Sequence, residues 1–179
     1  MDALGRASHA EARVYLTGGA TAVLEGWREA TIDIDLKVDP ERDEILRSFP
    51  RIKEELEINI ELASPGDFIP ELPAWRERSP FIARNGALFF HHYDFFSQAL
   101  SKLERRHRRD VEDVKEMFER RLIDGDRLAA FFAAIEPQLY RYPAIDPRAF
   151  RAAVEESRRE ENQTDEQDVT KDDAGGLIA

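Results

Sequence analysis

The eight residues TIDIDLKV, at positions 31–38, constrain the fold of this chain more than any other stretch. Their β-branched and aliphatic side chains favour a strand, in which successive side chains point to opposite faces. Asp33 and Asp35 therefore share one face, where like charges are destabilising, by roughly 0.2–1 kcal/mol for a directly opposed pair. The residues expected on the opposite face, in a hydrophobic core, are Ile32, Ile34 and Leu36. Because the charge pair costs stability, we expect it to serve another purpose.

The first half of the chain alternates strand-like and helix-like segments, which predicts an α/β core. Gly18-Gly19 separates the first strand from a helix with apolar residues at i, i+3, i+4 and i+7. Asp39-Pro40 predicts an N-cap and a first-turn proline for a second helix, expected to reach Phe49. The expected strands are residues 14–17, 31–38, 58–62, 81–84 and 87–93, the last two joined by an Asn85-Gly86 hairpin turn.

From residue 94 onward the apolar spacing is helical. Gly125 is expected to close the second helix of this half, and Asp146-Pro147 to open the last, which should end near Arg159. The polar, acidic remainder is typical of disorder. The sequence therefore predicts an α+β protein in three parts. Residues 1–93 form a small mixed sheet flanked by helices, 94–160 a helical bundle packed on it, and 161–179 an acidic, disordered tail.

Composition narrows the classes of function. The 179 residues include no cysteine, which excludes disulfides and cysteine–zinc sites. We expect a cytoplasmic protein without a membrane partner, because we find no apolar run near 18 residues and no secretory signal pattern. The net charge of −11 argues against general nucleic-acid binding. Residues 102–109, KLERRHRR, nevertheless hold five basic residues against one acidic, so this segment is either a local phosphate-binding strip or a solvated helix face.

The paired aspartates suit a divalent cation. Magnesium prefers oxygen ligands and usually takes one or two carboxylates together with substrate phosphates. A third carboxylate on an adjacent strand would complete the site, and Glu57 and Glu61 lie on one face of the segment that contains the expected strand 58–62. Glycines at a strand-to-helix turn let the backbone approach a ligand, and the N–H groups beyond them favour phosphate. The simpler interpretation is an acidic pair on a solvated edge strand.

The tryptophans have different expected roles. Trp27 completes the apolar stripe of the first helix, which predicts packing. Trp75 lies in a segment expected to be a loop, so stacking on a nucleic-acid base is a candidate role.

Strand, Gly18-Gly19, amphipathic helix and the Asp33/Asp35 strand, in this order, resemble the DNA polymerase β-type nucleotidyltransferase superfamily. The resemblance implies that both aspartates bind Mg²⁺ as catalytic residues, that Glu61 completes the metal site, and that the two glycines cradle a nucleoside triphosphate. Residues 95–118 resemble the Lys-then-Arg-Asp-x-x-Asp helix of bacterial AbiEii and MenT-type toxins. That likeness implies that Lys102 contacts the phosphates and Asp110 supports the site; the alternatives are a surface lysine and a helix cap.

The resemblance implies a magnesium-dependent enzyme of a toxin–antitoxin type system, with an antitoxin protein as partner. It would transfer a nucleoside monophosphate from a triphosphate to an acceptor hydroxyl. The acceptor stays open among tRNA or another RNA, a protein side chain and a small molecule. The alternative is a nucleotidyltransferase fold that binds without turnover. The candidates for RNA contact are Arg105, Arg106, Arg108 and Arg109.

Overall fold

A computed structural model describes residues 1–175 of the chain, and its side chains as far as residue 163. The chain divides into two compact units, Met1–Gln98 and the residues from Ala99 onward. The first unit contains a five-stranded mixed sheet and the described part of the second is helical, so the predicted α+β class is confirmed. The boundary lies within helix α5 (Phe95–Arg105) rather than before it.

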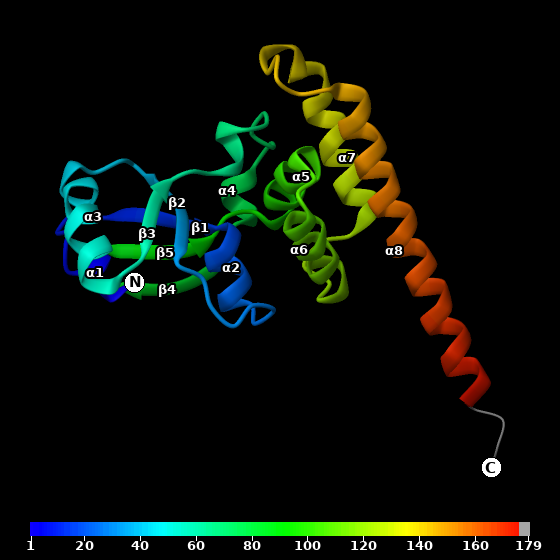
Figure 1. The fold of residues 1–179 in the computed structure, drawn as a ribbon, viewed down its shortest axis with the longest axis horizontal. Coiled ribbons are helices and arrows are strands. Elements are labelled where there is room, and N and C mark those ends of the chain that lie inside the picture. Colours follow the sequence, from blue (N-terminus) through cyan, green and yellow to red (C-terminus); the bar gives the residue numbers. More distant parts are fainter. Residues whose placement is uncertain (176–179) are drawn as a thin grey trace. The chain divides into compact units, whose positions relative to one another are not determined.

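The sheet of the first unit has the strand order β3-β2-β1-β5-β4 (Figure 1). The central strand β1 pairs antiparallel with β2 and parallel with β5, while β3 is parallel to β2. The expected hairpin is confirmed: β4 and β5 are antiparallel, and Gly86 between them has a φ of +60°. The strands are β1 (Ala12–Thr17), β2 (Asp33–Asp39), β3 (Asn59–Leu62), β4 (Phe81–Asn85) and β5 (Leu88–His92).

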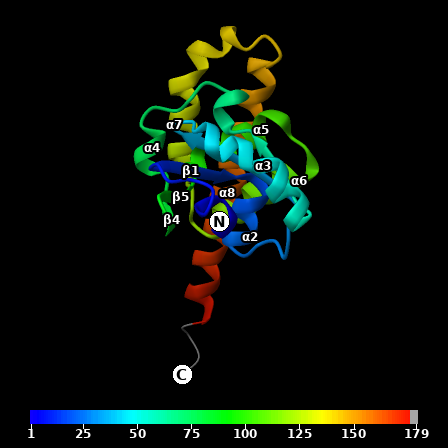
Figure 2. The same ribbon diagram turned by 90° about the vertical axis from the view of Figure 1, so that its left-hand side faces the viewer.

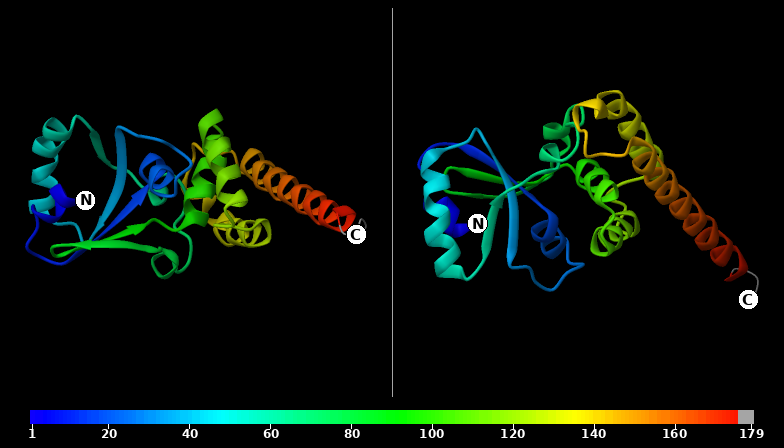
Figure 3. Two further views of the ribbon diagram at one scale, coloured as in Figure 1. Left: turned by 90° about the horizontal axis from the view of Figure 1, so that it is seen from below. Right: turned by 45° about the horizontal axis from the view of Figure 1, so that its top comes forward.

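Short helices fill the connections of this unit, and one longer helix, α3, covers a face of the sheet. Figure 2 looks onto the side that carries α1 and α3, and Figure 3 shows these two helices beside each other. The helices are α1 (Asp2–Gly5), α2 (Gly18–Leu24), α3 (Asp43–Leu56) and α4 (Trp75–Arg78), with a 3-10 turn, η1 (Pro65–Asp67).

The predicted bounds of α3 are wrong. The helix starts at Asp43 rather than at Asp39-Pro40, with acidic residues in its first turn, where the helix dipole favours them. It continues through Pro50 instead of ending at Phe49. Phe49 and Ile52 are both buried against the sheet, so the apolar period extends past the proline. Burying Ile52 outweighs the hydrogen bond that Pro50 cannot donate.

The two faces of the sheet differ in character. One face packs against helices α1 and α3 and forms an apolar core with them, which includes Val14, Leu36 and Phe90. Tyr15, on the opposite face, meets Trp75 edge-on at 4.8 Å, and Trp75 stacks on Tyr93 at 4.2 Å between ring centroids. Trp75 is only 2% exposed, so it is a core residue and not an accessible base-stacking group as the loop position suggested.

The second unit contains three further helices and a 3-10 segment. The stretch over residues 95–118 is not one helix. Arg106 has a φ of +54°, which interrupts the helix and separates α5 from α6. Gly125 does not close α6 but starts α7, where the Asp124 carboxylate accepts a hydrogen bond from the Arg127 N–H at 2.8 Å. The elements are α6 (Arg108–Glu119), α7 (Gly125–Ile135), η2 (Glu136–Arg141) and α8 (Pro147–Gly175).

Helix α8 lies along α7 and is longer than expected (Figure 1). Asp146 caps its first turn as predicted, with Oδ1 accepting from the Arg148 N–H at 2.9 Å. The expected end near Arg159 is wrong, because the backbone stays helical to Gly175, through most of the segment expected to be a disordered tail. Glu, Gln, Arg and Lys are good helix formers, so few apolar residues do not preclude a helix. The last part of the expected tail, 176–179, lies outside the described residues.

Within residues 1–175, no helix combines the length and the apolar content needed to cross a bilayer.

A buried ion pair joins α4 to the start of α5 within the first unit. The Asp94 carboxylate accepts from Arg78 Nε at 3.0 Å and Nη2 at 2.8 Å, and from the Ser97 hydroxyl at 2.7 Å. Asp94 is 1% exposed and Arg78 19%. Removing one partner of such a pair leaves a charge without compensation in the interior.

We therefore expect Arg78→Ala to lower the free energy of unfolding by about 3–5 kcal/mol, measured by urea denaturation of the full chain. The matched control is Arg47→Ala, which removes an ion pair to Asp43 that is more than 80% exposed on both sides. The control should lose only about 0.3–0.5 kcal/mol. Equal losses in the two variants would contradict the role assigned to the buried pair.

Candidate functional site

The parallel pairing of β2 with β3 creates an acidic face. Asp33 lies opposite Asn59 in the register and Asp35 opposite Glu61. Since residues at alternate positions share a face, these four side chains project from the same side of the sheet. The structure therefore brings Asp33, Asp35 and Glu61, the three carboxylates expected from the sequence, onto adjacent positions of two strands.

Asn59 links the carboxylates of this face. Its Nδ2 donates to Glu61 Oε1 at 2.8 Å and approaches Asp33 Oδ1 at 3.5 Å. The Lys53 ammonium, on α3, donates to Asn59 Oδ1 at 3.1 Å. This contact fixes which end of the amide is the donor, because the oxygen must face the lysine. The amide hydrogens therefore point to the acids and offset part of their mutual repulsion.

The acidic face fits a divalent cation only in part. No three His, Asp or Glu side chains among the described residues converge closely enough to hold a metal ion. Magnesium needs only one or two carboxylates when phosphate oxygens supply further ligands. Asp33 and Asp35, two positions apart on β2, meet that requirement. Glu61, hydrogen-bonded to Asn59, is an adjacent carboxylate rather than part of a preformed three-ligand cluster.

Two expectations for this region are wrong. Glu57 is not on the strand with Glu61: it is the left-handed C-cap of α3, with a φ of 53°, because the chain turns there before β3 begins. Ile32 does not enter the core. It is 67% exposed, since β2 begins one residue later and at this end of the strand only Ile34 and Leu36 face the apolar side.

The Gly18-Gly19 turn lies against the acidic strand. Gly18 has a φ of +58°, and a Cβ built on it would lie 3.0 Å from Asp35 Oδ2. A Cβ on Gly19 would lie 2.5 Å from Thr31 Oγ1 and 3.4 Å from the Asp33 carbonyl oxygen. Both glycines thus allow the turn to approach the start of β2 closely. Helix α2 has only seven residues, so individual N–H groups matter more here than a helix dipole.

Lys102 and Asp110 lie together in the second unit. Lys102 Nζ donates to Asp110 Oδ1 at 3.2 Å and to Asp113 Oδ2 at 2.6 Å, and all three side chains are buried. Arg105 Nη2 also donates to Asp110, at 3.0 Å. The surface-lysine alternative is therefore wrong. Asp110 does not cap the helix, because α6 already starts at Arg108. This cluster therefore holds α5 and α6 together beside the turn that separates the two helices.

The basic residues of 102–109 are largely paired with acids. Besides Lys102 and Arg105, Arg106 contacts Glu156 at 2.8 Å and Arg108 contacts Glu112 at 3.0 Å. These partners neutralise much of the local positive charge. The strip is therefore less available to phosphate than its sequence indicates.

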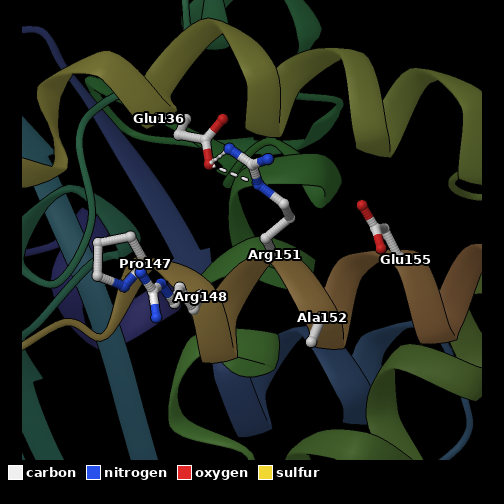
Figure 4. Close-up of a pocket in the computed structure, with 6 residues that line it drawn as sticks. All are labelled: Glu136, Pro147, Arg148, Arg151, Ala152 and Glu155. Atoms are coloured by element: carbon white, nitrogen blue, oxygen red, sulfur yellow. Dashed lines mark hydrogen bonds and ion pairs between the residues drawn. The ribbon is translucent and has the colours of Figure 1, made fainter.

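A shallow hollow of about 320 Å³ lies on the second unit, beside the start of α8 (Figure 4). Arg151 Nε donates to Glu136 Oε1 at 2.9 Å across it. None of the residues expected to function lines the hollow. The lining residues are Glu136, Pro147, Arg148, Arg151, Ala152 and Glu155.

A buried polar network beneath the glycine turn has no signal in the sequence. Gln98, Thr21 and His92 are buried and linked by hydrogen bonds, although they come from α5, α2 and β5. Burial lowers the pKa of the His92 imidazole to about 4. The Glu25 carboxylate, 2.9 Å from Nε2, opposes this shift but is 27% exposed and partly screened by water. Nδ1 of the ring lies 3.2 Å from the Thr21 hydroxyl oxygen, which donates its hydrogen to the Leu16 carbonyl oxygen at 3.2 Å.

Comparisons of the chain with family models, curated proteins and solved structures found no match. The functional argument therefore rests on the residues of this chain.

Substitution of Gly18 tests the close approach of the turn to β2. Gly18→Ala and Gly26→Ala both place a Cβ at positive φ, which costs roughly 1–2 kcal/mol. Only Gly18→Ala also meets a neighbour, because nothing lies within 4 Å of a Cβ on Gly26. We expect Gly18→Ala to lose more unfolding free energy in urea denaturation. Equal losses would mean that Asp35 moves aside at no cost.

The His92 imidazole predicts a pH dependence of stability. Its pKa in the folded chain, about 4, lies below its ordinary value of 6.5, so the unfolded state binds the proton more readily between these values. The free energy of unfolding should therefore fall as the pH drops from 6.5 to 4. In His92→Gln that part of the slope should be absent, whereas other titrating groups contribute to both proteins. A slope unchanged by the substitution would refute the assignment.

Proposed function

We propose that this chain is a magnesium-dependent nucleotidyltransferase that transfers a nucleoside monophosphate from a nucleoside triphosphate to an acceptor hydroxyl. The observation that carries the proposal is the register of β2 and β3. It sets Asp35 opposite Glu61, with Asp33 on the same face and the Gly18-Gly19 turn packed against Asp35. An acidic face beside a glycine turn suits a bound cation and a triphosphate.

Each residue has a stated role in this proposal. Asp33 and Asp35 hold Mg²⁺, which when bound neutralises phosphate charge and orients the reacting oxygens. Glu61 serves as a further ligand or accepts the proton of the acceptor hydroxyl. The acceptor oxygen forms a bond to the α-phosphorus while the bond from that phosphorus to the bridging oxygen breaks, and pyrophosphate leaves. Backbone N–H groups of the glycine turn bind phosphate oxygens.

The second unit has a supporting role in the proposal. On the resemblance alone, we propose that Lys102 contacts the triphosphate and Asp110 supports the site; Lys102 forms buried ion pairs with Asp110 and Asp113. An RNA hydroxyl remains the first acceptor class, with contact through the exposed guanidinium groups of residues 105–109. We further propose a toxin–antitoxin setting with a protein partner, on the resemblance alone.

A second candidate function is a nucleotidyltransferase fold that binds nucleotide without turnover. Asn59 favours it, because its amide stands between Asp33 and Glu61, where an additional carboxylate would strengthen a metal site. In this case magnesium and triphosphate would bind, and no pyrophosphate would be released.

The decisive experiment incubates the chain with each α-labelled nucleoside triphosphate, Mg²⁺ and total bacterial RNA. We expect label in RNA. Asp33→Asn and Asp35→Asn should each reduce labelling by more than the roughly 10–100-fold typical of losing an outer-shell partner of a metal. Asp39→Asn, the same change on the same strand at its exposed ion pair with Arg76, is the matched control and should retain activity.

The outcomes separate the candidates. Label on a protein band moves the acceptor from RNA to protein. Magnesium-dependent binding without label or pyrophosphate release selects the second candidate function. Labelling that survives both Asp→Asn changes would refute the metal assignment, and absence of both binding and labelling would refute the proposal.

A further inference from the structure

A glycine turn that binds a ligand needs something to hold it. Glycine populates positive and negative φ with similar ease, so the peptide at Gly18 can rotate unless a neighbour fixes it. In this chain the Gly18 N–H donates to the Gln98 side-chain oxygen at 3.0 Å. Gln98 comes from α5, far along the chain, and its side chain is fully buried beneath the turn.

The Gln98 amide can adopt only one orientation. Its Nε2 donates to the Tyr93 carbonyl oxygen at 2.7 Å and to Thr21 Oγ1 at 3.3 Å. A flipped amide would place its oxygen against the Tyr93 carbonyl oxygen, where two acceptors repel each other. The side chain therefore presents its oxygen, and only its oxygen, to Gly18.

Further buried contacts fix the side chain of Thr21. Its hydroxyl lies 3.2 Å from the Leu16 carbonyl oxygen and 3.2 Å from His92 Nδ1, and His92 Nε2 contacts Glu25. The network thus connects strands β1 and β5 to the first turn of α2. Groups fixed this firmly preorganise a binding turn before the ligand arrives.

We infer that Gln98 is a positioning residue that clamps the Gly18 peptide, so that the N–H groups after Gly18 meet the phosphates of a nucleoside triphosphate. This inference rests on the proposed function. It also divides the roles of the glycine pair. The Gly18 N–H donates to Gln98, so in this inference the phosphate contacts fall to the N–H groups that follow it.

Gln98→Met tests the clamp, because it keeps the side-chain length and removes the amide. The matched control is Ser97→Ala on the same helix, which removes a buried hydrogen bond to Asp94 without touching the turn. In the ¹⁵N-labelled full chain we expect Gly18 amide exchange to become about 10-fold faster or more in Gln98→Met only. Titration with the magnesium complexes of ATP, GTP, CTP and UTP should show about 3–10-fold weaker binding, the effect of one net hydrogen bond.

Thr21→Val provides a second variant if Gln98→Met does not fold. It is nearly isosteric and removes the hydroxyl that supports Gln98, so both effects should appear in the same direction and be smaller.

The outcomes distinguish the inference from the proposed function. Unchanged Gly18 exchange in Gln98→Met overturns the clamp. Faster exchange with unchanged binding in that variant overturns the positioning role and leaves the nucleotidyltransferase proposal intact. A wild-type chain that binds none of the four complexes overturns the proposed function and this inference together.

Discussion

Repulsion between carboxylates on one face of a narrow sheet region is the constraint on which the first unit depends. Asp33, Asp35 and Glu61 occupy adjacent positions of β2 and β3, and the pleat keeps their charges together. Neighbouring side chains offset this repulsion or hold the strands in place against it. Asn59, oriented by Lys53, directs amide hydrogens toward two of the acids. On the opposite face of the same strands, Leu36 and Ile60 are buried in the core, and this burial holds the acidic face in register.

The order of elements in the first unit could be predicted, because it depends on local patterns. The alternation in 31–38 and the Asn85-Gly86 turn follow from side-chain period and turn chemistry. The pairing of β2 with β3 that sets Glu61 opposite Asp35 is a long-range contact, which these local patterns do not determine. The bounds of α3 could not be predicted, because burial of Ile52 overrides Pro50. The burial of Trp75 could not be predicted for a related reason: only tertiary packing on Tyr93 reveals that its segment covers the sheet.

The candidate site shows the same division between local and distant information. Glycines and acids on consecutive elements are visible in the sequence, since each stands at a recognisable place in a strand or turn. Gln98 is not visible, because no local pattern distinguishes it from a surface glutamine and it reaches Gly18 only after folding. The buried cluster of Lys102, Asp110 and Asp113 is an intermediate case of predictability. Their spacing in the sequence resembles a known motif, but their mutual ion pairing depends on the turn at Arg106 between α5 and α6.

The short strand β3, which carries Asn59 and Glu61, lies at the edge of the sheet. Edge strands offer unpaired backbone groups to any other strand, and natural proteins protect them with charge and short length. Here the acids that suit a cation also discourage a second copy of the chain from adding its own strand. Neutralising this face, by substitution or by a bound ion, would therefore remove a barrier to self-association. The same carboxylates link the chemistry of the site to the solubility of the protein.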